Sequence, residues 1–377
     1  MTTEVRLLGL NEYSEIAAFI DQHWKKDHAY ARSKELFDWT FKENPAWNKQ
    51  DCYSFSVAVD KGSIIGMLGA IPFKLNDHGK TINACWLTNW IVLPEVKGGK
   101  GLALLNLFSK EHGFDTVSFG INNKVASLYA ALGWQEMQPI ARMEWISPFK
   151  IDSAEDLIRM TNPAACDDTI REYIAQASAV TYTNDQPEAR SLNEVDAATW
   201  NRKGWNIWIK KTIGCAREYA YLNWRYLHHP VYQYETRVVV EDDRLGLIVW
   251  RSEITRKVDL NGECENYVSF IRIVEFLPVS DANARNLMSI CLFDGAKEGA
   301  VAADFYCYSA ELMQTLKRIG FFISDDTSGV CLPNHTQPIA QGSNIRSTIK
   351  VFSDKGHAHQ DTEWYWTRSD SDQDRPN

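Results

Sequence analysis

Several features that would indicate a metal site, a membrane segment or a nucleic-acid surface are missing from this sequence. The eight cysteines stand apart, with no C-x-x-C pair and no histidine at ligand spacing beside them, which argues against a metal site. Neither a charged-then-apolar leader nor an apolar run of membrane length occurs, so we expect a cytoplasmic chain with reduced thiols and no membrane partner. A formal net charge of −9 argues against nucleic acid as a partner. The expected ligands are therefore small molecules.

What is present is an internal repeat. The chain has 377 residues, which is long for one domain and ordinary for two. Four landmarks recur in one order about 185 residues apart, namely Leu10/Leu192, Trp39/Trp224 with Pro45/Pro230, Pro94/Pro278 and Trp134/Phe321. We expect one domain at residues 1–150, a connecting segment at 151–190, a second domain at 191–353 and a tail at 354–377.

Both copies alternate patterns typical of strands and helices. In the first copy, "YSFSVAVD", "IIGMLGAIPFKL" and "NACWLTNWIVLP" read as strands, and "LALLNLFSKEHG" and "KVASLYAAL" read as helices. This alternation predicts an α/β fold in each copy, with a mixed sheet of the α+β kind and helices on both of its faces.

The stretch "VLPEVKGGKGLALL", from Val92 to Leu105, places three glycines and two lysines between a strand pattern and a helix pattern. Such a turn can bind an anion, because the first turn of a helix has unpaired N–H groups and glycine lets an anion approach the backbone closely. The alternative is a strand-to-helix turn with no ligand.

The order of motifs resembles the acyl-CoA-binding core of the GNAT N-acyltransferase superfamily. The resemblance is carried by the strand end and glycine loop above, followed by "NNKVASLYAALGW". It implies two tandem GNAT-like domains that use acyl-CoA as cosubstrate, with its pyrophosphate on the loop. The implied cofactor-binding residues are Ile91, Val92, Gly98, Gly99, Lys100, Gly101, Leu102, Ala103 and Asn122. Gly98 departs from the Arg or Gln usual at its position, which leaves Lys97 or Lys100 to supply charge.

The second copy is degenerate. Its loop reads "ANARNL", from Ala282 to Leu287, without glycine, and Leu316 stands where the first copy has Tyr129. We therefore expect a single CoA site, in the first domain. Landmarks found in both copies, such as Trp39 and Trp224, are expected to serve packing.

The tandem arrangement more narrowly resembles bacterial sugar N-acyltransferases of surface-polysaccharide pathways, of the anthrose type. This implies transfer of a 3-hydroxybutyryl or acetyl group to the C3 or C4 amine of a dTDP-linked aminodideoxyhexose. Alternatives are a GNAT enzyme that acts on a peptide or protein amine, and a catalytically inert CoA-binding module. We expect Arg225, Arg251 and Arg272, which look unpaired in the sequence, to bind the nucleotide sugar, together with Thr88.

The reaction requires an oriented amine, N–H donors for an oxyanion and a donor for the leaving thiolate. Tyr129 suits the last role, Asn89 suits orientation of the amine, and the backbone from Trp90 to Val92 suits the oxyanion. The strand carries no carboxylate, so a dedicated base is not evident, although a relay to a group elsewhere stays open. Asp370, Asp372 and Asp374 are spaced as in a calcium loop but lack its Gly and distal Glu, so we interpret them as a solvated tail. The oligomeric state does not follow from the sequence.

Overall fold

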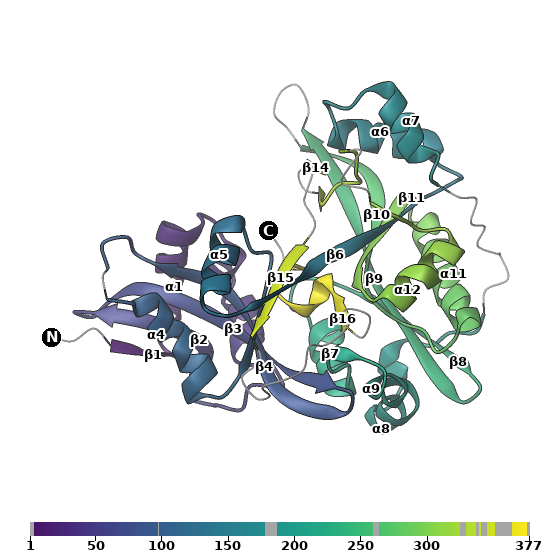
Figure 1. Ribbon diagram of the computed structural model, residues 1–377. Coiled ribbons are helices and arrows are strands. Elements are labelled where there is room, and N and C mark those ends of the chain that lie inside the picture. The colour runs from purple at the N-terminus through teal and green to yellow at the C-terminus, as the bar shows by residue number, and fades with distance from the viewer. Residues whose placement is uncertain are drawn as a thin grey trace.

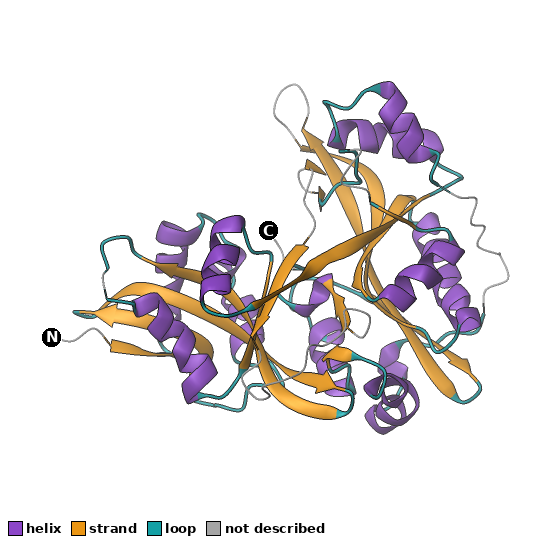
Figure 2. Cartoon of the chain, viewed as in Figure 1, coloured by secondary structure: helices purple, strands orange, loops and turns teal. Residues whose placement is uncertain are grey.

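The structure is a computed structural model that describes residues 4–96, 98–177, 187–258, 264–324, 329–336, 339–340, 345–350 and 364–374. Within these ranges, fourteen strands form one mixed sheet that passes through both halves of the molecule (Figure 1). Helices lie against both halves of this sheet (Figure 2). The predicted mixed α/β fold is thus confirmed.

The first repeat has helices on both faces of its sheet, as the sequence predicts. Its strands are β1 (Glu4–Gly9), β2 (Cys52–Asp60), β3 (Ser63–Asp77), β4 (Lys80–Val92), β5 (Asp115–Phe119) and β6 (Gln135–Ile146). Its helices are α1 (Tyr13–Phe19), α2 (Ala29–Arg32), α3 (Lys34–Phe41), α4 (Lys100–Asn106) and α5 (Asn123–Ala131). Successive residues of β4 join different cores, because Trp86 packs with residues of α1 to α3 and Leu87 packs with residues of α4 and α5.

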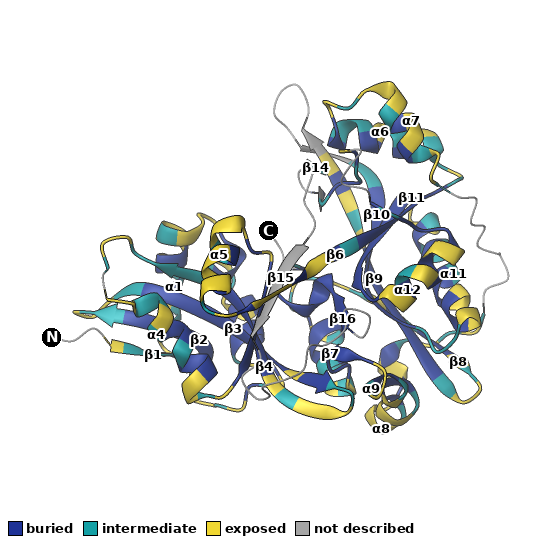
Figure 3. Cartoon of the chain, viewed as in Figure 1, coloured by how far each residue is buried: buried dark blue, intermediate teal, exposed yellow. Residues whose placement is uncertain are grey.

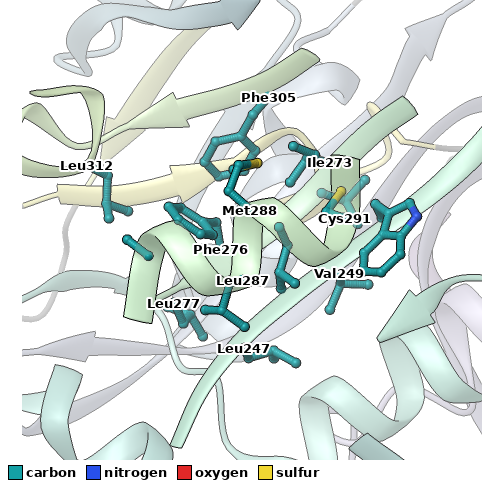
Figure 4. Packing of buried hydrophobic residues seen from close by; sticks show 14 of the residues in the cluster. Leu247, Val249, Ile273, Phe276, Leu277, Leu287, Met288, Cys291, Phe305 and Leu312 are labelled. Atoms are coloured by element: carbon teal, nitrogen blue, oxygen red, sulfur yellow. The ribbon is translucent and has the colours of Figure 1, made fainter. Parts of the chain in front are cut away.

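The second repeat follows the same order of elements. Its strands are β8 (Glu235–Glu241), β9 (Arg244–Val258), β10 (Cys264–Leu277), β11 (Ala300–Tyr308) and β12 (Phe322–Ile323). Its helices are α8 (Ala197–Trp200), α9 (Asn206–Ile209), α10 (Tyr219–Leu222), α11 (Asp281–Lys297) and α12 (Ala310–Ile319). Leu287, Met288 and Cys291 of α11 belong to the same buried cluster as Leu247 of β9 and Ile273 of β10 (Figure 4). α11, which takes the position of α4 in this repeat, therefore packs on a closed apolar core.

The two halves exchange strands, so the expected boundaries at 150 and 353 do not separate them. The remaining elements are α6 (Ile151–Thr161), α7 (Asp167–Ile174), β7 (Ile213–Cys215), β13 (His335–Thr336), β14 (Ile339–Ala340), β15 (Ile345–Lys350) and β16 (Trp364–Thr367). β15, expected in the second domain, pairs with β5 and β6 of the first repeat. The other end of β6, from Ala141 to Ile146, pairs with β11 of the second repeat. Figure 1 shows β6 running from one half into the other.

The paired landmarks Trp39 and Trp224 do serve packing. Their rings stack with centroids 4.4 Å apart at an interplanar angle of 15°. Each indole N–H donates to the backbone carbonyl of the other residue, at 3.1 Å and 3.0 Å. Equivalent residues of the two copies thus contact each other reciprocally, and the predicted structural role is confirmed.

The expectation of a solvated tail is wrong for the residues from Trp364 to Asp374, which we call the C-terminal segment. Trp366 is buried against Trp86 and Phe119, with ring centroids 5.3 Å away in each case. The aspartates that follow are also buried (Asp370 3%, Asp372 8% and Asp374 1% exposed). The aromatic strand β16 is buried between the two cores, and the carboxylates that follow it in the sequence are therefore buried too. Figure 3 shows buried residues along the strands on either side of the segment. No helix in the described ranges has the length and apolarity needed to cross a membrane.

Candidate active site

Two parallel strands of the first repeat, β4 and β5, separate part-way along their length, and we call this separation of the strands the cleft. β4 pairs with β5 from Ala84 to Leu87, and beyond Leu87 no pairing between these strands occurs in the described residues. At the point of separation, the pairing of β4 with β3 shifts register, and Asn89 adopts a positive φ of 51°. Such a bulge turns backbone N–H groups away from the ladder. From Trp90 to Val92, β4 is thus paired with β3 on one side only, and its other edge has no strand partner among the described residues.

The glycine loop lies at the outer end of this cleft. Gly98 and Gly99 have φ values of 88° and 69°, which favour glycine, and the space beside each of them is open. α4 begins at Lys100, and the N–H groups of Lys100, Gly101 and Leu102 have no acceptor among the described residues. Ala103 N–H is already bonded to the Gly99 carbonyl at 3.1 Å. Three unpaired donors at a helix start fit an anion. Lys97 lies outside the described residues.

Asn122 has a different local role from the one expected. It precedes α5, and its side-chain oxygen accepts from Val125 N–H at 3.0 Å, which caps the helix. Its side chain is exposed, so contact with a cosubstrate stays a prediction.

Tyr129 of α5 reaches the inner end of the cleft. Its ring stacks on Trp134 with centroids 4.1 Å apart and lies 5.8 Å from the ring of Trp90. The hydroxyl faces Ser118 Oγ at 3.4 Å, a long contact at the last β5 residue paired with β4. Burial raises the pKa of Tyr129 to about 12, so the phenol is protonated at neutral pH.

A polar cluster lies on β4 at the bulge. The Thr88 hydroxyl is 2.8 Å from Asn89 Oδ1, and it also contacts Asp372 Oδ2 of the C-terminal segment. Asn89 Nδ2 is buried without an acceptor among the described residues. An unpaired buried donor is costly, which points to a ligand oxygen at this place. The sequence analysis does not predict a role for Asp372, although the aromatic run from Trp364 to Trp366 is a signal that the chain is buried close to this residue.

A small pocket lies beside this cluster between the two repeats, with a cavity volume of about 20 Å³. Its aromatic lining consists of Tyr30, Trp39, Phe73, Trp86, Tyr221 and Trp224, and its charged or polar lining includes Arg225, His229, Asp370, Asp372 and Asp374. His229 Nδ1 accepts from the N–H groups of Val231 and Tyr232 at 3.1 Å and 2.9 Å. Burial lowers the pKa of His229 to about 3, so the imidazole is neutral and holds a turn of the chain.

The expectation that three arginines are unpaired is wrong. Arg251 pairs with Asp374 at 2.7 Å and contacts Glu253, and Arg225 Nε donates to the Ser369 carbonyl at 2.9 Å. Arg272 lies 3.2 Å from Glu253 and 3.3 Å from Asp304. Asp374 of the C-terminal segment is far from Arg251 in the sequence, whereas Glu253 lies two residues from Arg251 on the same strand. Direct binding of a nucleotide sugar by these three cations stays a prediction, and their charge is already compensated.

The second repeat differs at the equivalent strand edge and helix start. Glu275 and Phe276 stand at the positions of Ile91 and Val92, and the Tyr365 hydroxyl contacts Glu275 and lies 3.3 Å from Phe276 N. At the start of α11, Ser280 Oγ accepts from Asn283 N–H at 3.0 Å, and Asn283 Oδ1 accepts from Val279 N–H at 3.2 Å. Side chains of the protein itself thus accept hydrogen bonds from backbone N–H groups that would otherwise face a ligand.

Comparisons with known proteins agree with this geometry. Residues 4–110 match the family described as acetyltransferase (GNAT) domain, a range that runs from β1 through the bulge and the glycine loop. No curated protein matches the chain by sequence. Among solved structures, the chain resembles Saccharomyces cerevisiae N-myristoyltransferase with bound myristoyl-CoA, at 10% identity and a TM-score of 0.55, covering 92% of this chain and 82% of that one.

Two bacterial protein structures are also similar to this chain over nearly its whole length. One is a GCN5-related N-acetyltransferase from Anabaena variabilis, at 11% identity and a TM-score of 0.51, covering 92% of this chain and 72% of that one. The other is a probable N-acyltransferase from Enterococcus faecalis, at 12% identity and a TM-score of 0.52, covering 93% and 72%. At these identities the likeness establishes the fold, which is of the GNAT type and extends over nearly the whole chain.

Proposed function

We propose that this protein is an acyl-CoA-dependent N-acyltransferase that moves an acyl group from a CoA thioester to a primary amine. The observation that carries the proposal is the cleft between β4 and β5, with a bulge at Asn89 and a glycine loop at its outer end. The family match over residues 4–110 supports the same cosubstrate.

The residues of the cleft fit CoA. The N–H groups of Lys100, Gly101 and Leu102 would hold the pyrophosphate. The edge at Ile91 and Val92 would hydrogen-bond the pantetheine arm, as the equivalent Phe276 does with the Tyr365 hydroxyl in the second repeat. N–H groups of the bulge would stabilise the oxyanion, because fixed donors in a buried site need no reorganisation during the reaction.

Tyr129 would act as a hydrogen-bond donor to the leaving sulfur. A phenol with a pKa of about 12 is a much weaker acid than a thiol, whose ordinary pKa is about 8.5. Full transfer of the phenol proton to a thiolate would cost about 5 kcal/mol at that difference, whereas a hydrogen bond to the developing charge is favourable. This refines the proton-donor role that the sequence suggests.

Tyr129→Phe is expected to lower kcat by about ten- to a hundredfold, the value of one hydrogen bond to a charged group. The acyl-CoA Michaelis constant should change little, because the ring stack on Trp134 needs no hydroxyl. Steady-state kinetics with saturating amine measure both quantities. An unchanged kcat would limit Tyr129 to a packing role.

For the acceptor, we propose the C3 or C4 amine of a dTDP-linked aminodideoxyhexose, acylated with an acetyl or 3-hydroxybutyryl group in surface-polysaccharide biosynthesis. This finer proposal rests on the resemblance of the tandem repeats to sugar N-acyltransferases. The lining of the pocket suits this acceptor, because aromatic side chains suit the apolar face of a deoxysugar and carboxylates suit an amine, and these side chains would have to move apart to admit the ring. Arg225, the arginine in that lining, already donates to the carbonyls of Ser369 and Asp374, so the nucleotide would lie outside the pocket.

A peptide or protein amine is the second candidate, because a protonated amine on a flexible chain suits the same carboxylate-lined pocket. A thiol-release assay separates the two. It crosses acetyl-CoA and 3-hydroxybutyryl-CoA with dTDP-3-amino and dTDP-4-amino sugars, a lysine peptide and a peptide with a free N-terminus. Turnover only with amino sugars supports the sugar proposal, and turnover only with peptides supports the alternative. CoA binding without turnover on any amine would identify an inert binding module.

A further inference from the structure

We propose that Asp372 is the catalytic residue that accepts the proton of the attacking amine, and that contacts with the second repeat fix it in place for this step. The proposal rests on the acyltransferase function proposed above. It supplies the base that β4 lacks, from a part of the chain more than two hundred residues away in sequence.

The position of Asp372 is the first argument. Its Oδ2 contacts the Thr88 hydroxyl, one residue before the bulge at Asn89, and its Oδ1 accepts from Gln373 Nε2 at 3.1 Å. The same residue lines the pocket between the repeats. An ionised carboxylate can accept about four hydrogen bonds, so it can hold these two donors and an amine together. Asp372 therefore stands between the place where an amine would enter and the strand edge where a thioester would lie.

The second argument is how firmly the neighbours of Asp372 are held. Asp370 forms a two-pronged ion pair with Arg217, at 2.7 Å and 2.8 Å, and Asp374 pairs with Arg251 at 2.7 Å. Gln373 packs so closely on Gly120 that a Cβ at that glycine would lie 2.6 Å from the Gln373 amide nitrogen. Both cations belong to the second repeat. Cations of the second repeat thus fix the two aspartates on either side of Asp372, and Asp372 itself contacts Thr88 of the first repeat.

The chemistry balances without a further reactant. The amine nitrogen attacks the thioester carbon, a C–N bond forms, and the carbonyl π pair moves to oxygen, where the bulge N–H groups stabilise it. Bond formation makes the nitrogen acidic, and its proton moves to Asp372. The C–S bond then breaks, its electron pair leaves with sulfur, and the thiolate takes up the proton from Asp372 directly or through water. The products are an amide and CoA thiol, and Asp372 is again ionised.

The test uses the full chain and the best amine from the thiol-release assay. Asp372→Asn keeps an acceptor for Thr88 but cannot take a proton, so we expect kcat to fall by about 10²- to 10³-fold with an unchanged acyl-CoA Michaelis constant. Asp372→Gly should be equally slow, and formate should restore part of its kcat. Asp168→Asn, an exposed change on α7, is the control and should match the wild type.

Thermal unfolding and CoA affinity, measured on each variant, show whether it is folded. A folded Asp372→Asn protein with wild-type kcat would overturn the proposal and leave the acyltransferase function standing. Loss of activity in Asp372→Gly without any rescue by formate, together with full activity in Asp372→Asn, would overturn it in the same way. A wild-type chain that acylates no amine would overturn both the function and this inference.

Discussion

Gly101→Asp is expected to weaken CoA binding by at least about a hundredfold while the protein keeps its fold. Gly101 lies in the first turn of α4, and a Cβ at this position would meet Trp90 at 3.5 Å, an ordinary contact. Its φ is not positive, so a side chain costs little in the backbone. A carboxylate in a first helical turn is stabilising for the helix. The same carboxylate would occupy the place of the anion and repel the pyrophosphate. The repulsion energy is about 3 kcal/mol for two unit charges about 5 Å apart at an effective dielectric constant of about 20.

Calorimetry with CoA measures this change. The matched control is Arg285→Asp, which makes the equivalent substitution in the second repeat, on the exposed face of α11. The control should bind CoA like the wild type, because the donors before α11 are already bonded to Ser280 and Asn283. Unchanged affinity in Gly101→Asp, or a loss in Arg285→Asp, would place the pyrophosphate elsewhere.

Arg217→Met is expected to lower the free energy of unfolding by about 3 to 5 kcal/mol, the usual cost of leaving buried charges without their partner. Arg217 is fully buried and pairs with both Glu275 and Asp370. Its guanidinium also lies 5.2 Å from the ring centroids of Tyr221 and Tyr365. Removing the cation would leave two carboxylates in a site where burial already raises the pKa of Glu275.

Denaturant unfolding of the wild type and the variant measures this loss. Arg318→Met serves as a control, because the pair of Arg318 with Asp281 is about half exposed and should contribute less than about 1 kcal/mol. The triple change Arg217→Met, Glu275→Gln and Asp370→Asn should recover part of the lost stability, since it removes the uncompensated charges. Equal stability of Arg217→Met and the wild type would mean that this ion pair does not hold the C-terminal segment to the second repeat.

The features that the sequence predicts well are local or periodic. Side chains of a strand point alternately to its two faces, so Trp86 and Leu87 of β4 join different cores. The glycine loop marks the start of α4. Both features follow from short stretches of the sequence. Recurrence at one offset predicts a packing role for Trp39 and Trp224, and the structure adds that the two residues pack on each other.

The features that it misses depend on partners far apart in sequence. Nothing near Arg251 reveals that Asp374 compensates its charge, since 123 positions separate the two residues. β15 pairs with β5, and β6 pairs with β11, although the internal repeat assigns the two strands of each pair to different domains. The sequence alone places Asp372 in a solvated tail for the same reason, because its contact with Thr88 spans 284 positions.

The most direct test of a single CoA cleft is hydrogen–deuterium exchange of the full chain with and without CoA. We expect protection of the segment from Ile91 to Ala103, where the helix start has unpaired donors and the strand edge faces no partner strand among the described residues. We expect no change from Glu275 to Leu287, where Tyr365, Ser280 and Asn283 already satisfy the equivalent groups. Protection of the second segment, or of neither segment, would contradict a single CoA site in the first repeat.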